Sequence, residues 1–152
     1  MNYNDILRKI RYTFDFRDAQ MVSIFKSVEF PVTIEQVQAW LKPDGPDVTP
    51  INDKQLALFL NGFINLKRGK REGPPMKPEK RLNNNIILRK LKIALNLKDE
   101  DMIEIFKLSG THISKHELSA FFRKPDQKQY RLCKDQYLRN FLMGLQKKFR
   151  RE

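Results

Sequence analysis

An internal repeat constrains this chain more than any other feature. Residues 4–27 align with residues 85–108 at a constant offset of 81, and the alignment continues from 32–41 onto 113–122. One inserted residue in the second half then brings 53–62 onto 135–144. The first segment alone contains these identical pairs: Asn4/Asn85, Ile6/Ile87, Leu7/Leu88, Arg8/Arg89, Lys9/Lys90, Asp18/Asp99, Met21/Met102, Ile24/Ile105, Phe25/Phe106 and Lys26/Lys107. So many matches in one order identify a duplicated unit of about 65 to 70 residues.

Each copy of the unit predicts four helices and no strand. Apolar residues recur at helical spacing in every one of them, as at Ile6, Leu7, Ile10 and Phe14 in the first. Nowhere do apolar and polar residues alternate over the length of a strand. We therefore predict an all-α fold made of two tandem four-helix repeats.

Start and stop signals mark the third helix of each copy. Thr33 and Gln36 form a capping box in the first copy, in which two side chains satisfy backbone donors at the helix start. Ser114 and Glu117 repeat this box in the second copy. A proline follows the apolar end of each of these helices and cannot continue it. Both signals favour a short third helix.

The predicted organisation is a helical repeat over residues 1–68, a linker over 69–84 and a second repeat over 85–152. The linker contains three prolines, which make it extended and rather stiff. A half of this size buries a modest fraction of its surface and would be marginally stable alone. We therefore expect the two halves to pack on each other about a pseudo-two-fold axis.

Most polar residues shared by the copies lie where helices are predicted to begin, where capping explains them. These pairs are Asn4/Asn85, Asp18/Asp99 and Asp53/Asp135. Capping does not explain the shared cations Arg8-Lys9/Arg89-Lys90 and Lys26/Lys107.

Glycine and cysteine also have structural interpretations. Gly62 and Gly144 lie inside the fourth helix, where glycine costs about 1 kcal/mol relative to alanine, so close approach of another backbone is expected. Cys133, the one cysteine, aligns with Ile51 and is expected to fill an apolar position.

The sequence supports no enzyme, cofactor or metal site. It has no glycine-rich phosphate loop, and a single cysteine cannot build a disulfide framework or a thiolate metal site. His112 and His116 are four residues apart, but the predicted helix starts between them at Ser114. We expect a protein that is not an enzyme.

Basic charge is concentrated toward the end of the chain. Residues 1–68 hold nine basic and eight acidic side chains, whereas residues 85–152 hold sixteen and eight. This asymmetry is compatible with a surface that faces a polyanion, and equally with lysine-rich solvated faces. As a hypothesis, weak and salt-sensitive contacts to nucleic acid, either DNA or RNA, come from Arg89, Lys90, Lys92, Lys115, Arg123, Lys124, Arg131, Arg139, Lys147, Lys148 and Arg150.

Two local patterns bear on this hypothesis. Residues 88–122 have a helix-turn-helix-like order, in which Ser114, Lys115, His116, Ser119 and Arg123 would face a groove. Residues 121–124, 128–131 and 146–151 interleave cations with aromatic rings, as proteins that hold single strands do. The alternative function is a protein–protein adaptor or a homodimeric scaffold with no nucleic-acid role.

No stretch approaches the ~18 apolar residues of a membrane span, so no membrane partner is expected. The start of the chain also lacks the apolar segment of a secretory signal. We expect a cytoplasmic protein.

The chain as a whole resembles the YehS-like family of small bacterial proteins, a duplicated domain of unknown function. The resemblance rests on NDILRKIRY at 4–12, FLNGFINLKRGK at 59–70, NNNIILRKLKIAL at 83–95 and DQYLRNFLMGL at 135–145. It implies a small helical protein of the bacterial cytoplasm. It carries over no activity and no functional residues.

Overall fold

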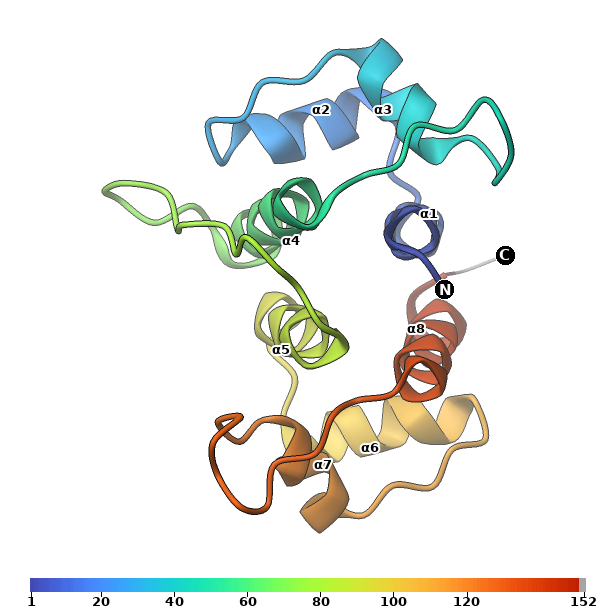
Figure 1. The fold of residues 1–152 in the computed structure, drawn as a ribbon, viewed down its shortest axis with the longest axis vertical. Coiled ribbons are helices and arrows are strands. Elements are labelled where there is room, and N and C mark those ends of the chain that lie inside the picture. Colours follow the sequence, from blue (N-terminus) through green and yellow to red (C-terminus); the bar gives the residue numbers. More distant parts are fainter. Residues whose placement is uncertain (151–152) are drawn as a thin grey trace.

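A computed structural model describes residues 1–150 of the chain (Figure 1). These residues form eight α-helices and no strand. The helices are α1 (Tyr3–Phe14), α2 (Asp18–Lys26), α3 (Ile34–Leu41), α4 (Asp53–Arg68), α5 (Asn84–Ala94), α6 (Asp99–Leu108), α7 (Lys115–Phe121) and α8 (Asp135–Phe149). The prediction of an all-α fold with four helices in each repeat is confirmed.

The first and fourth helices of both repeats form the centre of the molecule. In Figure 1, α1, α4, α5 and α8 are seen end-on, with α2 and α3 beyond them at the top and α6 and α7 at the bottom. Across the boundary between the repeats, α4 packs against α5 and α1 packs against α8. Each contact pairs the fourth helix of one repeat with the first helix of the other, which is the predicted pseudo-two-fold arrangement.

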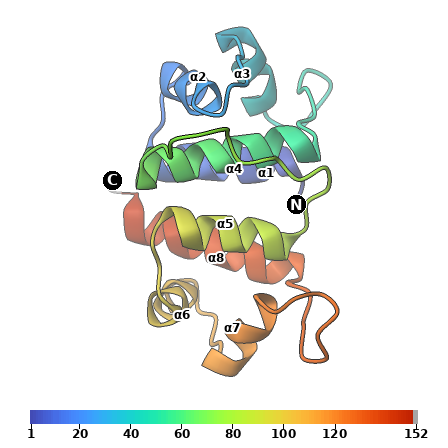
Figure 2. The ribbon, with the colours of Figure 1, turned by 90° about the vertical axis from the view of Figure 1, so that its left-hand side faces the viewer.

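All four central helices run in the same direction. The linker makes this possible because it returns along α4 to the end where α4 began (Figure 2). There the backbone N–H of Leu82 donates to Oδ2 of Asp53 at 2.7 Å, and the hydroxyl of Tyr3 donates to the same oxygen at 3.0 Å. The starts of α1, α4 and α5 therefore lie together.

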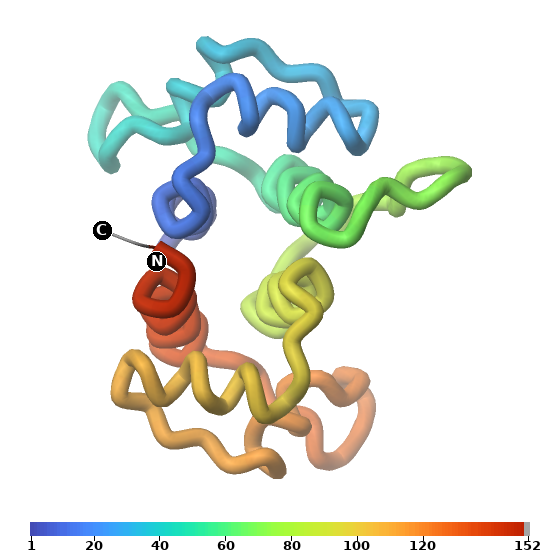
Figure 3. The backbone as a smooth tube through the Cα atoms, turned by 180° about the vertical axis from the view of Figure 1, so that it is seen from behind, coloured from blue at the N-terminus to red at the C-terminus, as the bar shows by residue number. Residues whose placement is uncertain are grey.

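Parallel central helices place four positive helix ends on one side and four negative ends on the other. The first turns of α1, α4 and α8 each carry an aspartate. The opposite ends, which face the viewer in Figure 3, carry these cations in their last turns: Arg11, Lys67, Arg68, Lys92, Lys147 and Lys148. The charges offset the aligned helix dipoles and make one side of the central bundle basic.

Aromatic rings join the repeats at this basic side. The centroid of the Phe14 ring in α1 lies 5.1 Å from that of Phe63 in α4 and 5.4 Å from that of Phe149 in α8. Lys67 lies over the Phe14 ring, with its Nζ 4.8 Å from the ring centroid. The hydrophobic core is therefore continuous across the boundary between the repeats.

Gly62 and Gly144 are glycines because another backbone crosses them. A Cβ atom built at Gly62 would lie 2.9 Å from the carbonyl carbon of Ile24 in α2. One built at Gly144 would lie 2.9 Å from the carbonyl carbon of Ile105 in α6. The expected close approach is confirmed in both repeats, and it fixes how closely the second helix lies on the fourth.

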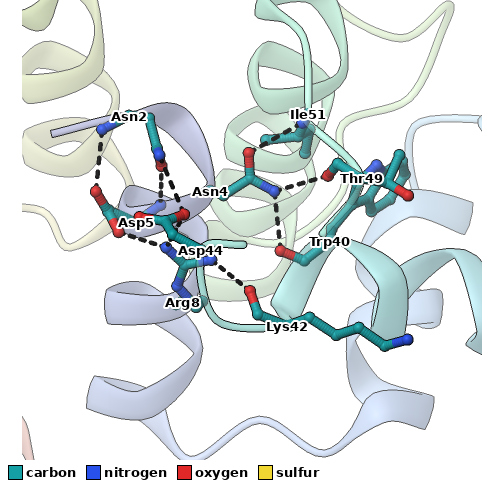
Figure 4. A network of polar contacts seen from close by, with 9 residues as sticks. All are labelled: Asn2, Asn4, Asp5, Arg8, Trp40, Lys42, Asp44, Thr49 and Ile51. Atoms are coloured by element: carbon teal, nitrogen blue, oxygen red, sulfur yellow. Dashed lines mark hydrogen bonds and ion pairs between the residues drawn. The ribbon is translucent and has the colours of Figure 1, made fainter. Parts of the chain in front are cut away.

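Asn4 and Asn85 do not cap helices, which corrects the prediction for this pair. Asn2 and Asn83 are the N-cap residues of α1 and α5. Asn4 is buried inside α1, where its Nδ2 donates to the carbonyls of Trp40 and Thr49, both at 2.9 Å (Figure 4). Its Oδ1 accepts from the N–H of Ile51 at 3.1 Å. The side chain thus fastens the segment between α3 and α4.

Asn85 makes the same three bonds in the second repeat. Its Nδ2 donates to the carbonyls of Phe121 and Arg131 at 3.1 and 2.7 Å, and its Oδ1 accepts from the N–H of Cys133 at 2.8 Å. Both asparagines satisfy backbone groups that have no helical partner. The duplication therefore preserved a buried tertiary lock.

The capping predictions have mixed outcomes. Both capping boxes of the third helices are present, with Thr33 bonded to Gln36 and Ser114 to Glu117. The aspartates at the starts of α2, α4, α6 and α8 occupy the first helical position instead of the cap. There they complement the positive helix end without capping it.

Replacing Gly62 or Gly144 by alanine is expected to destabilise the protein by about 1–3 kcal/mol, because the added methyl group collides with a backbone carbonyl. Urea denaturation followed by circular dichroism measures this loss. Met143→Ala, at the exposed position next to Gly144, should change the free energy of unfolding by no more than about 0.5 kcal/mol. An unchanged midpoint for both glycine variants would contradict the close approach.

Asn4→Ala and Asn85→Ala should each cost about 3 kcal/mol or more, since each leaves three backbone groups without their partner. Asn2→Ala removes only a helix cap and should cost about 1 kcal/mol. The same denaturation experiment compares them. Equal losses of unfolding free energy for Asn2→Ala and Asn4→Ala would show that Asn4 stabilises the protein no more than a helix cap does.

Candidate functional site

The structure removes Lys90 from the predicted basic surface. Its side chain is buried, and its Nζ donates to Oδ1 of Asn61 in α4 at 2.6 Å. The same Nζ lies 3.0 Å from Oε1 of Glu79 in the linker. The ammonium group is therefore neutralised inside the protein, where it ties together the linker, α4 and α5. Lys9, its equivalent in the first repeat, is exposed because no linker passes there.

Arg150 also serves the fold. Its Nη1 donates to the carbonyl of Tyr12 at 2.7 Å and to Oδ1 of Asp15 at 3.2 Å. Its guanidinium carbon lies 4.1 Å from the centroid of the Tyr12 ring. These contacts fasten the end of α8 to the end of α1, so this arginine is not a free phosphate contact.

The other predicted cations are spread over several elements. Lys147 and Lys148 lie in the last turn of α8. Arg139 lies nearer the start of that helix and donates to Gln136, three residues before it. Lys115 lies at the start of α7, 3.7 Å from Glu100. Arg89 and Lys92 line a hollow where α4 and α5 end, beside Phe122. Arg123 and Lys124 follow the end of α7.

The helix-turn-helix-like order is present in α6 and α7, but its serines are engaged locally. The hydroxyl of Ser114 accepts from the backbone of Glu117 as a cap, and that of Ser119 donates to the carbonyl of Lys115. α7 itself has seven residues. These contacts do not support base reading in a duplex groove.

A groove of about 590 Å³ lies between α7, the segment that follows it and α8. The residues that line it are His116, Glu117, Ala120, Phe121, Lys128, Gln129, Arg131, Leu132, Lys134 and Tyr137. The cations Lys128, Arg131 and Lys134 are exposed. Because Asn85 fastens the backbone of this segment at two points, the groove has a fixed wall.

One part of the groove is apolar. Leu132 is 65 % exposed although it is a large apolar residue. The ring of Tyr137 meets the ring of Phe121 edge-on, with centroids 5.4 Å apart, and this contact holds Tyr137 in place. The combination of cations with exposed apolar surface suits a ligand that carries both negative charge and flat apolar groups.

The first repeat provides an internal control for the charge of this groove. The three groove cations Lys128, Arg131 and Lys134 correspond to Pro46, Thr49 and Asn52 in the first repeat. His116 and Gln129 correspond to Glu35 and Asp47. The same scaffold therefore carries a cationic lining in one copy and an acidic one in the other. The fold does not require these cations, because the first copy forms without them.

The predicted contacts omit Lys128 and Lys134, which the structure places beside Arg131. A signal was present in the alignment of the two copies. Both lysines stand where the first copy has an uncharged residue, whereas predicted contacts such as Lys90 are shared by both copies. Comparing the copies for differences in charge would have found them.

Cys133 lies under the groove and takes no part in it. Its side chain is buried, as its alignment with Ile51 predicts. Burial and the nearby carboxylate of Asp135 raise the pKa of the thiol to about 12. The thiolate needed for nucleophilic attack is therefore scarce at neutral pH.

Residues 1–150 contain no cluster of three histidine, cysteine or acidic side chains that could hold a metal ion. Nor is any helix among them both long and apolar enough to cross a membrane.

Cys133 is expected to react with a thiol reagent such as DTNB at about pH 8 only after the protein unfolds, because its folded pKa lies far above that pH. Absorbance with and without urea measures this. The unfolded thiol ionises first, so the free energy of unfolding should fall as the pH rises above about 9. Prompt stoichiometric labelling of the folded protein would contradict the burial.

Comparison with known proteins places the chain in a family. The model of the family described as "Protein of unknown function (DUF1456)" matches it twice, at residues 3–69 and 84–151. The chain is 43 % identical over 144 residues to "Uncharacterized protein YehS" of Escherichia coli (strain K12). The aligned residues cover 93 % of this chain and 92 % of that protein. No solved structure matches. The chain therefore belongs to this DUF1456 family, with one copy of the family domain in each repeat.

Proposed function

We propose that this protein is a non-enzymatic module that binds single-stranded nucleic acid, through the groove between α7, the segment 122–134 and α8. The observation that carries the proposal is the charge difference between the copies. Lys128, Arg131 and Lys134 surround a groove whose counterpart in the first repeat has no cation at the equivalent positions.

The chemistry of the groove favours a single strand over a duplex. Cations at its rim neutralise phosphates, and the exposed Leu132 with the partly buried Tyr137 offers surface to unpaired bases. A duplex exposes no base faces to such a surface. The serines of α7, which a duplex reader would direct at base edges, are occupied within their own helix.

Three cations imply modest affinity with a defined salt dependence. Each neutralised phosphate of a single strand contributes about −0.7 to the slope of log K against log salt, so the expected slope is about −2. The proposal includes a location in the cytoplasm, where single-stranded RNA is abundant.

The alternative of an adaptor receives no comparable support. The exposed large apolar residues Ile34, Leu66, Met76, Ile93, Leu108, Leu132 and Met143 lie on seven different segments of residues 1–150. A dimer face would have to gather several of them into one patch, which the sedimentation experiment below tests.

Fluorescence anisotropy with labelled DNA and RNA strands of about a dozen nucleotides tests the proposal at low salt. We expect binding at tens of micromolar protein or below, and a triple Lys128→Ala, Arg131→Ala, Lys134→Ala variant that binds at least about tenfold more weakly. The control variant Lys9→Ala, Lys26→Ala, Lys54→Ala removes the same charge from exposed positions of the first repeat.

Three results would overturn the proposal. Absence of binding at low salt is the first. The second is an equal loss in both triple variants, which would mean that affinity follows net charge alone. The third is a dimer in sedimentation that resists salt and is lost with Leu132→Ser, which would favour the scaffold.

A further inference from the structure

A second hollow, of about 390 Å³, lies where α4 and α5 end side by side. It is lined by Arg68 from α4, by Arg89, Lys92, Ile93, Asn96 and Leu97 from α5 and the turn after it, and by Phe122. It thus takes residues from both repeats. Two arginines and a lysine face it together with apolar side chains.

The pseudo-two-fold axis relates this hollow to the place where α8 and α1 end, and there the arginine is neutralised. Arg150 is the equivalent of Arg68, and its guanidinium stacks on Tyr12 and donates to Oδ1 of Asp15 at 3.2 Å. The equivalents of Tyr12 and Asp15 at the hollow are Ile93 and Asn96. Arg68 therefore has neither the aromatic ring nor the carboxylate.

The backbone at the two places is the same, so the difference lies in side-chain charge. Asp15 has φ 54° and Asn96 has φ 52°, the left-handed conformation in which each follows its helix. Arg68 is exposed and makes no hydrogen bond or ion pair with another of residues 1–150. A carboxylate at position 96 would stand to Arg68 as Asp15 stands to Arg150.

The second arginine of the hollow also makes no ion pair within residues 1–150, although Asp126 stands in the place of Asp44. Arg8, the equivalent of Arg89, pairs with Asp5 and with Asp44, the latter at 3.2 Å (Figure 4). Ile86 stands in the place of Asp5. Nη2 of Arg89 donates only to the carbonyl of Phe122, at 3.3 Å, and pairs with no carboxylate among the described residues.

Lys92 completes the wall of the hollow but adds little free charge. Its Nζ lies 3.0 Å from Oδ1 of Asp99 and 4.5 Å from the centroid of the Phe122 ring. The unbalanced charge of the hollow is therefore that of Arg68 and Arg89. The C-terminal ends of α4 and α5 each carry about half an elementary negative charge, which repels an anion. Lys67 in the last turn of α4 helps to offset this negative charge.

We propose that this hollow binds the phosphate group of a small phosphorylated molecule. Arg68 and Arg89 would donate to the phosphate oxygens through their forked N–H groups, and the amide of Asn96 is a further donor. Ile93 and Leu97 offer apolar surface to the rest of the ligand. The site is separate from the groove of Lys128, Arg131 and Lys134, and it does not depend on the function proposed for that groove.

Asn96→Asp is the decisive variant, because it introduces a carboxylate at the position equivalent to Asp15, which binds Arg150 at the place related to the hollow by the pseudo-two-fold axis. Aspartate holds the same backbone conformation at position 15, so the fold should tolerate it. Gln36→Glu is the control with the same change of charge, at an exposed position where the second repeat has Glu117.

The experiment is a titration of the full chain with inorganic phosphate, followed by ¹H–¹⁵N NMR, with chloride at equal ionic strength as the reference. We expect phosphate to shift the resonances of Arg68, Arg89 and Asn96 selectively. Asn96→Asp should weaken the phosphate affinity about tenfold, and Gln36→Glu should change it less than about twofold.

Two results would overturn the phosphate site. One is an equal affinity in the wild type and in Asn96→Asp, when circular dichroism shows that both are folded. The other is a set of shifts spread over the exposed lysines without preference for the hollow. The triple variant of the groove should bind phosphate like the wild type, so a failed nucleic-acid experiment and a failed phosphate experiment are distinguishable.

Discussion

The burial of α4 on all sides is the constraint on which the rest of this structure depends. Every residue from Leu56 to Ile64 is buried, over two and a half turns of helix. One repeat cannot cover such a helix, because α2 and α1 reach only part of its circumference. The remainder is closed by α5 of the other repeat, so the pairing of repeats is a condition for a complete core.

This pairing also explains where the cations are. To bring α5 against α4 in the pseudo-two-fold arrangement, the linker returns along α4, and all four central helices then point the same way. Their negative ends gather on one side, and the last turns of these helices carry lysine and arginine. A share of the basic charge therefore serves the helix dipoles, which is why net charge alone identifies no binding surface.

The duplication separates structural residues from those available for binding. Asn4 and Asn85 make equivalent bonds, and Gly62 and Gly144 meet equivalent carbonyls, so these positions belong to the scaffold. Charge differs between the copies at the groove beside α7 and at the hollow where α4 and α5 end. In the groove the second copy has cations where the first copy has none, and at the hollow Arg68 and Arg89 make no ion pair with any described residue although their equivalents Arg150 and Arg8 do. Such differences are where we place binding.

The amino-acid sequence by itself determined the repeat, the helical class, the capping boxes and the close approach at the glycines. These depend on residues within about one helical turn of each other, or on comparison of the two copies. Only the tertiary structure decided the roles of Asn4, Lys90 and Arg150, because their partners lie 36 to 47, 11 to 29 and 135 to 138 residues away, respectively. A cation in a sequence is free or neutralised according to which carboxylates folding brings beside it, and local patterns carry no record of that.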